Sequence, residues 1–160
     1  MFDDYKISEI TNEDLKKQYA EQILRLLPDW FGDEDSLVEY VNTVTESPFF
    51  AAFSDDQCVG FFAGKIHHER TGDIYVCGIH PEHHNCGLGK KLYFELEQYF
   101  INNGCDHVVV KTLSPLRPSV HYNRTREFYH AVGFNDFYTN HEIWGKKNPC
   151  LIMVKNLNKY

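Results

Sequence analysis

Along residues 73–103 the hydrophobic pattern changes from one typical of a strand to one typical of a helix. β-Branched and aromatic residues gather at 74–79, as in a half-buried strand, and Pro81 and a polar loop follow. After that loop, apolar residues recur at helical spacing, at positions 88, 92, 96, 99 and 100. The pattern predicts a strand, a turn containing Gly87 and Gly89, and a helix that stops near Gly104.

The same two patterns alternate along the rest of the chain. Further strands are predicted at residues 5–10, 49–53, 58–67, 108–112, 134–139 and 151–156, and further helices from 11 or 12 to 27, at 33–44 and near 122–131. The polar residues 54–57 predict a hairpin turn, and the sequence VVVKT at 108–112 predicts a strand buried on both faces. This order predicts an α/β (α+β) fold with a mixed sheet and crossover helices.

Length and composition predict one globular domain over residues 1–160. Hydrophobic residues make up 42% of the chain and aromatic residues 15%, which is typical of a globular protein and argues against disorder. No run approaches the roughly 18 apolar residues of a membrane span. The acidic start MFDDYKISEI has no leader pattern, so we expect a cytoplasmic protein without membrane contact. A net charge of −7 argues against nucleic-acid binding.

The charge is uneven along the chain. Residues 1–56 contain 14 acids and 4 bases, the remaining residues contain 9 acids and 12 bases, and no acid occurs between 107 and 126. This distribution suits a protein that holds a polyanionic cofactor in one half and attracts a cationic acceptor with the other. An acidic, solvated face on two surface helices explains the first half equally well.

The cysteines and histidines do not form a metal-binding pattern. Five cysteines without a C-x-x-C pair argue against disulfides and structural zinc, and Cys58, Cys77 and Cys150 are expected to be core thiols. Cys86 lies in the glycine loop, where an oxidisable thiol is the first interpretation and a catalytic cysteine is the less favoured one. The histidine clusters at 67–68 and 80–84 lack an H-E-x-x-H arrangement and are better explained as solvated loops, so no metal is expected.

The turn before the long helix can bind an anion. The first N–H groups of a helix have no partner within it and lie at the positive end of its dipole, and glycine lets a phosphate approach the backbone. Lys90 and Lys91 add positive charge. A Gly-x-Gly turn is weak evidence by itself, because many strand–helix turns use glycine only to turn.

Two motifs in the C-terminal half of the chain are more specific than this turn. His84-Asn85-Cys86-Gly87-Leu88-Gly89 resembles the Gln/Arg-x-x-Gly-x-Gly pyrophosphate loop of the GNAT-type acyl-CoA N-acetyltransferase superfamily. Residues 128–134, FYHAVGF, resemble its Phe-Tyr-x-x-x-Gly-Phe signature. His84 stands where the family has Gln or Arg, for which we expect weakened rather than lost cofactor affinity. Several further segments resemble a bacterial branch whose substrates are mostly unassigned.

The resemblance implies a GNAT-like, mostly antiparallel sheet with a splayed parallel strand pair and about four flanking helices. Acetyl-CoA is the implied co-substrate, with pantetheine between residues 75–79 and 108–111. The implied cofactor-binding residues are Cys77, Gly78, Ile79, His84, Asn85, Cys86, Gly87, Leu88, Gly89, Lys90 and Tyr129.

The resemblance also implies catalytic roles. Tyr129 is the candidate acid, since a phenol can protonate a leaving thiolate; otherwise it is an amphipathic residue packed on the sheet. Asp73 stands where histone-type members carry a glutamate base, or it is an exposed carboxylate beside the turn at 71–72. His68 and Glu69 are alternative bases.

For the acceptor side, Trp30 and Phe31 match the region that walls the acceptor site in the family, with Tyr75 beside it. An aromatic pair in such a loop can equally serve only to cover the core. The resulting prediction is an N-acetyltransferase acting on a primary amine of a small molecule or peptide by direct attack in a ternary complex, with a homodimer as the family analogy for assembly. The rival predictions are a non-catalytic acyl-CoA-binding module and a transferase for another acyl donor.

Overall fold

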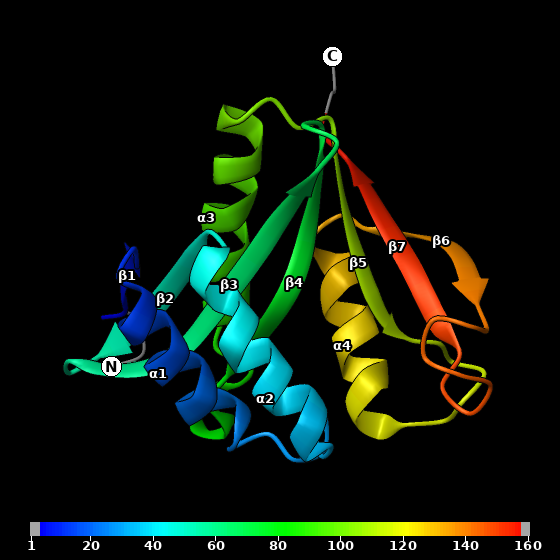
Figure 1. Cartoon of the computed structure of the whole chain (residues 1–160), viewed down its shortest axis with the longest axis horizontal. Helices are drawn as coiled ribbons and strands as arrows, with labels where there is room; N and C mark the ends of the chain where they lie inside the picture. Colours follow the sequence, from blue (N-terminus) through cyan, green and yellow to red (C-terminus); the bar gives the residue numbers. More distant parts are fainter. Residues whose placement is uncertain (1–3, 158–160) are drawn as a thin grey trace.

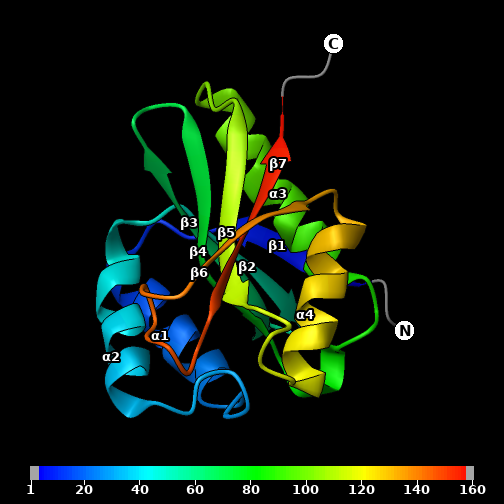
Figure 2. The same cartoon turned by 90° about the vertical axis from the view of Figure 1, so that its right-hand side faces the viewer.

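A computed structural model describes residues 4–157, which form a seven-stranded sheet with helices on both faces (Figures 1 and 2). The strand order is β1-β2-β3-β4-β5-β7-β6, and only the β4–β5 pair is parallel. The predicted fold class is therefore confirmed. Residues 1–3 and 158–160 of the predicted domain, including the first residues of the acidic start, lie outside the described residues.

The predicted elements are present with small shifts at their ends. The strands are β1 (Lys6–Glu9), β2 (Phe49–Ser54), β3 (Gln57–His67), β4 (Thr71–Ile79), β5 (His107–Leu113), β6 (Asn135–Asn140) and β7 (Cys150–Asn156). The helices are α1 (Glu13–Leu24), α2 (Glu34–Thr43), α3 (Leu88–Asn102) and α4 (Val120–Ala131), with 3-10 turns at Val44–Glu46 and Pro81–His83. The predicted hairpin between β2 and β3 turns at Asp55 and Asp56, which both have positive φ.

Two hydrophobic cores lie on the two faces of the sheet. Helices α1 and α2 pack on one face, where Ile23, Leu24 and Leu37 meet Phe49 and Phe61. Helices α3 and α4 cover the other face with a larger cluster that includes Leu92, Leu96, Phe100, Tyr129, Phe62 and Val108. Figure 2 shows the sheet between these two helix pairs. Each fully buried leucine or phenylalanine contributes roughly 1.5–3 kcal/mol, so the two pairs hold the sheet firmly from both sides.

Strand β5 differs from its prediction. Val108 and Val110 are buried, but Val109 is only half-buried and Lys111 is exposed, so the strand is buried on one face rather than on both. The reason is the reach of the helices: the core formed with α1 and α2 uses β2, β3 and β4, and includes no residue of β5. The outward face of β5 is therefore available to the site described below.

The parallel pair separates halfway along its length. Ala63 of β3 pairs with Val76, and Gly64 pairs with Ile74, so Tyr75 is an extra residue in β4, which is a β-bulge. The β4–β5 ladder ends at the same place, with Ile74 opposite Val110, and the strands diverge beyond it (Figure 1). The prediction of a gap beside residues 75–79 agrees with this, but residues 108–110 are paired, and on the β5 side the gap begins at Lys111.

Candidate active site

A cavity of about 920 Å³ occupies the gap between β4 and β5 and reaches both faces of the sheet. That volume lies toward the upper end of the range of roughly 300–1,000 Å³ that is typical of small-molecule and cofactor sites. Every predicted site residue except Cys86 lines it. The sulfur of Cys86 points back into its own loop, where it donates to the carbonyl of His83 at 2.9 Å and contacts the Tyr5 hydroxyl.

The N-terminus of α3 opens into this cavity without a side-chain cap. Its N-cap residue is Gly87 in the left-handed region, at φ +83°, with no side-chain hydrogen bond to the helix. The other described α-helices each have a side-chain cap, from Asn12, Asp33 and Ser119. The first N–H groups of α3 therefore face the cavity at the positive end of the helix dipole, where an anion is stabilised.

The loop before α3 is held against the end of β4. The ring of His84 donates from Nε2 to the carbonyl oxygen of Ile79 at 2.7 Å, and Asn85 adopts a positive φ of 61°. His84 thus binds one of the backbone groups that was predicted to contact the cofactor. In this structure His84 fixes the distance between the loop and β4, while the amides at the start of α3 stay open.

The two glycines of the loop act differently. A Cβ at position 87 would meet no atom within 4 Å, so only its backbone conformation requires glycine. A Cβ at position 89 would lie 3.1 Å from the ring of Phe128 on α4. Gly89 therefore lets α3 and α4 pack closely, and Gly87 shapes the opening.

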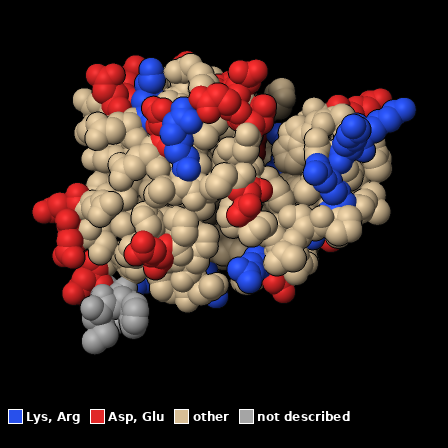
Figure 3. All heavy atoms as spheres, turned by 90° about the horizontal axis from the view of Figure 1, so that it is seen from below, with Lys and Arg blue, Asp and Glu red and all other residues tan. Residues whose placement is uncertain are grey.

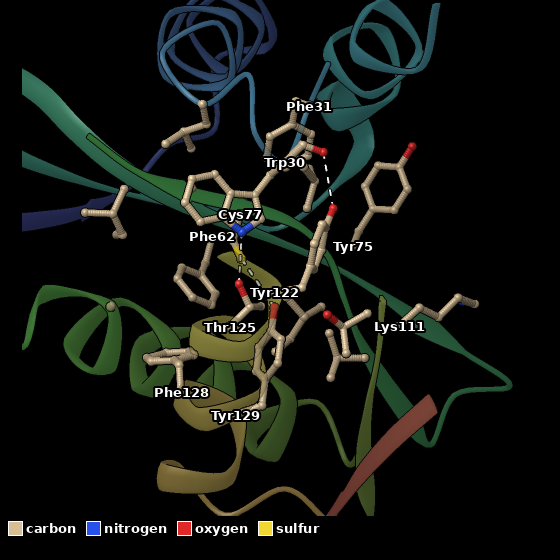
Figure 4. A pocket seen from close by; sticks show the side chains of 18 of the residues that line it. Trp30, Phe31, Phe62, Tyr75, Cys77, Lys111, Tyr122, Thr125, Phe128 and Tyr129 are labelled. Atoms are coloured by element: carbon tan, nitrogen blue, oxygen red, sulfur yellow. Dashed lines mark hydrogen bonds between the residues drawn. The ribbon is translucent and has the colours of Figure 1, made fainter. Parts of the chain in front are cut away.

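Tyr129 lies deep in the cavity on α4. It is only 5% exposed, and its hydroxyl lies 3.7 Å from the sulfur of Cys77 on β4. Burial, and then the neighbouring Cys77 thiol, raise the pKa of Tyr129 well above its usual range, so the phenol remains a proton donor. Figure 4 shows Tyr129 and Cys77 from opposite walls of the cavity.

Cys77 is only partly the core thiol that the sequence predicted. It is half-buried and lines the cavity, whereas Cys58 and Cys150 are buried. Burial raises the pKa of Cys77 to about 11, and a hydrogen bond with Tyr129 offsets part of this rise. The thiol is therefore neutral at physiological pH, which makes it a poor nucleophile.

Asp73 is buried rather than exposed beside the turn. It is 5% exposed, its Oδ2 lies 2.8 Å from His67 Nε2, and Lys111 Nζ lies 3.8 Å away. The alternative bases His68 and Glu69 are exposed in the β3–β4 turn, with positive φ, and do not line the described cavity. Of the three candidate bases, only Asp73 reaches the site.

Trp30 connects the loop after α1 to α4 across the cavity. Its indole Nε1 donates to the hydroxyl of Thr125 at 3.0 Å, and the hydroxyl of Tyr122 donates to its backbone carbonyl at 3.2 Å (Figure 4). Phe31 packs edge-on against Tyr40. Both residues line the cavity, and both also pack against the core formed with α1 and α2. The pair therefore combines the two roles considered for it, a wall of the cavity and a cover of the core.

Several lining residues were not predicted as site residues. They are Leu27, Ser36, Glu39, Tyr40, Phe62, Lys111, Thr112, Tyr122, Arg124, Thr125, Ile143 and Trp144, among others. Thr112 stands out because it is 2% exposed and its hydroxyl has no hydrogen-bond partner among the described residues. These positions come from the loop after α1, from α2, β3, β5 and α4, and from the β6–β7 loop, which only the fold brings together.

The charges around the cavity follow the uneven charge of the sequence. Figure 3 shows most acidic side chains of this face over the half that carries α1 and α2, and a group of Lys and Arg on the side of β6 and β7. Helix α2 contributes Asp33 at its N-cap and Glu34 and Asp35 in its first turn. Both parts of the predicted asymmetry are thus surface features, in agreement with the solvated-face alternative for α2.

Among residues 4–157 no group of three or more His, Cys, Asp or Glu side chains is placed to hold a metal ion. Within the same range, none of the helices has the length and apolar character required to span a bilayer.

The chain belongs to the acetyltransferase (GNAT) family, whose model matches residues 5–134. The predicted family is therefore confirmed. The chain is 34% identical over 98 residues to a mycothiol acetyltransferase of Streptomyces griseus, an alignment that covers 59% of this chain and 28% of that protein. It spans about a third or less of the length of the curated relatives it matches.

Solved structures show the same fold at low sequence identity. A GNAT-family protein from Desulfovibrio desulfuricans superposes with a TM-score of 0.81 at 17% identity, covering 96% of this chain and 99% of the other. The aminoglycoside 6'-N-acetyltransferase from Enterococcus faecium superposes with a TM-score of 0.76 at 20% identity, covering 97% and 98%. At these identities the likeness concerns the fold alone.

Proposed function

We propose that this chain transfers the acetyl group of acetyl-CoA to a primary amine of a small molecule or peptide, by direct attack in a ternary complex. One observation carries the proposal. A single cavity joins the uncapped N-terminus of α3, the unpaired edge of β4, the protonated phenol of Tyr129 and the carboxylate of Asp73. These are the groups that acetyl transfer to an amine requires.

The residues present fit the cofactor. The amides at residues 88–90, the loop from His84 and the ammonium of Lys90 suit the pyrophosphate. The edge of β4 at Cys77, Gly78 and Ile79 has no strand partner on the β5 side and suits the amides of pantetheine. The unpaired hydroxyl of Thr112 is a further polar group for this part of the ligand.

Different groups around the gap are suited to different steps of acetyl transfer. Bound acetyl-CoA supplies a thioester carbonyl, which a neutral amine attacks. An N–H of β4 at Cys77–Ile79 is the candidate donor to the acyl oxygen, and such a donor contributes roughly 3 kcal/mol in studied enzymes. Tyr129 is the candidate donor of a proton to the departing sulfur. The hydroxyl of Tyr129 already contacts a sulfur atom in this structure, that of Cys77 at 3.7 Å.

Asp73 is the candidate base that takes a proton from the acceptor ammonium. Its buried carboxylate lines the cavity on the face of the sheet opposite to Tyr129, beside Tyr75 and Glu39. Aromatic and acidic groups on that side suit a cationic amine.

The comparisons do not point to one acceptor. The relatives and structural neighbours carry the names of mycothiol, aminoglycoside and ribosomal-protein-S18-alanine acetyltransferases. A thiol-release assay with acetyl-CoA should therefore cover spermidine, kanamycin, free amino acids and a hexapeptide with N-terminal alanine. We expect at least one of these amines to release CoA faster than water does.

Tyr129→Phe and Asp73→Asn test the enzyme against the two rivals. If the roles above hold, each lowers kcat by about 100-fold, in the range of acid–base catalysis, while CoA affinity changes little. Tyr138→Phe, an exposed tyrosine on β6, is the matched control and should leave kcat unchanged. Tight CoA binding without turnover on any amine would favour the binding module, and turnover only with succinyl-CoA would favour the other acyl donor.

Assembly, location and domain extent stay predictions. The exposed Phe137 and Tyr138 on the edge strand β6 suit a homodimer contact, which light scattering would detect. A cytoplasmic location and a single domain over residues 1–160 are also still expectations.

A further inference from the structure

The buried carboxylate of Asp73 needs a route by which a proton can leave. Asp73 is 5% exposed, and its Oδ2 lies 2.8 Å from Nε2 of His67, whose side chain is 46% exposed. The ammonium of Lys111, 3.8 Å from the same oxygen, can only donate. A neutral imidazole nitrogen can accept a proton, so His67 is the neighbour able to receive one from Asp73.

The β3–β4 hairpin sets this pair by its register. Lys65 lies opposite Asp73 and His67 lies opposite Thr71, so His67 is the diagonal neighbour of Asp73 on the same face. Asp73 lines the cavity, whereas His67 is not part of the described lining. Asp73 therefore faces the cavity, and His67 joins it to solvent from outside the described cavity lining.

The other charged and titratable groups near the pair do not offer a second route. The ammonium of Lys65 lies 3.8 Å from the centre of the Tyr75 ring. From α2, Glu39 lines the cavity, and burial raises the pKa of Tyr40 to about 12, so its phenol stays protonated. Neither lysine can accept a proton from Asp73, because an ammonium group only donates.

We propose that His67 is a positioning and proton-relay residue, which orients Asp73 and carries to solvent the proton that Asp73 takes from the acceptor. The inference rests on the proposed acetyl transfer. The acceptor ammonium loses one proton to Asp73 and becomes the neutral amine that forms the C–N bond. Asp73 passes the proton to Nε2 of the His67 tautomer that carries its hydrogen on Nδ1, and the carboxylate is ionised again. The imidazolium releases the Nδ1 proton to water or buffer, and exchange with water moves the remaining hydrogen from Nε2 back to Nδ1 before the next turnover.

Two substitutions at His67 separate its two tasks. His67→Gln keeps an N–H donor for Asp73 but cannot carry a proton, and His67→Ala leaves space for an added imidazole. With acetyl-CoA and whichever of spermidine, kanamycin, amino acids or the alanine hexapeptide reacts fastest, we expect kcat to fall on the order of 10-fold in both. Imidazole should restore His67→Ala but not His67→Gln, after correction for a blank without enzyme.

His130→Ala is the matched control. His130 and Asp136 form an equally short pair of 2.8 Å with a similarly exposed ring, but that carboxylate is exposed and outside the described cavity lining. Its kcat should stay at the wild-type value and should not respond to imidazole. Asp73→Asn should be slow with or without imidazole, and combining it with His67→Ala should add little, because the two residues act as one unit.

The outcomes separate the relay from the proposed function. Wild-type protein that releases no thiol with any amine overturns both. Active wild-type protein with His67 variants as fast as His130→Ala overturns the relay alone. A lowered kcat in His67→Ala that neither imidazole nor buffer concentration changes would show a purely structural role and would also overturn the relay.

Discussion

The N-termini of α3 and α4 face the same cavity, yet they are built in opposite ways. Helix α4 begins at Ser119, whose hydroxyl accepts from the amide of Tyr122 at 3.2 Å. Helix α3 begins at Gly87 with φ +83° and has no side-chain cap. A cap satisfies a helix internally, whereas an uncapped start leaves donors for a ligand. Helix α4 therefore supplies side chains to the site, and α3 supplies backbone amides.

The largest expected effect comes from adding a methyl group at the open end. Gly87→Ala should weaken CoA binding on the order of 30-fold, about 2 kcal/mol, because the Cβ enters the space in front of the amides. Gly104→Ala is the matched control, since Gly104 lies at the other end of the same helix with φ +86° and equally open surroundings. Both variants should lose a similar ~1–2 kcal/mol of stability.

Calorimetry with CoA and chemical unfolding of both variants test this comparison. Equal CoA affinities in Gly87→Ala and Gly104→Ala would place the phosphate site elsewhere and remove the main support for the proposed function.

Removing the unpaired hydroxyl beside the gap should separate stability from binding. Thr112→Val keeps the shape of a buried side chain and removes a polar atom that has no partner in the described structure. We expect the free energy of unfolding to rise by about 1 kcal/mol and the CoA affinity to fall about 5-fold. Lower stability together with unchanged affinity would mean that the hydroxyl has an internal role instead.

Removing the cap of α4 should lower stability without changing CoA affinity. Ser119→Ala should lower the free energy of unfolding by about 1 kcal/mol and leave CoA affinity within error. Asn12→Ala, which removes the side-chain cap of α1, is the matched control with the same expected loss. A clear loss of CoA affinity in Ser119→Ala alone would show that the start of α4 also holds the ligand.

The smallest effect is an alkaline loss of stability from the buried phenol of α4. Burial raises the pKa of Tyr129, so above about pH 10 the unfolded chain loses this proton first and binds fewer protons than the folded chain. Its contribution is present below that pH and is lost as pH rises, by about 0.4 kcal/mol at pH 10. Tyr129→Phe should flatten this part of the curve in urea unfolding between pH 8 and pH 10.5; an equal slope in both proteins would contradict it.

Local patterns predicted the elements well because each element depends on neighbouring residues. The helical spacing after Gly87, the helix start at residue 11 or 12 and the hairpin turn at residues 54–57 need no distant contact. Where the predicted burial was wrong, a distant element decided the result. β5 is buried on one face only, because α1 and α2 do not reach it. The end of α1 at Leu24 rather than at residue 27 is a local difference, since the chain continues in tighter turns up to Pro28.

The sequence by itself determined the glycine turn, the tyrosine motif and the succession of strands and helices along the chain, since periodicity and backbone conformation are local properties. Only the tertiary structure decided which groups meet in the cavity. The bulge at Tyr75 ends the β4–β5 pairing, the hairpin register sets His67 beside Asp73, and Trp30 bonds Thr125 across 95 positions of sequence. Such contacts depend on how helices and strands pack, and packing joins residues that no local pattern connects.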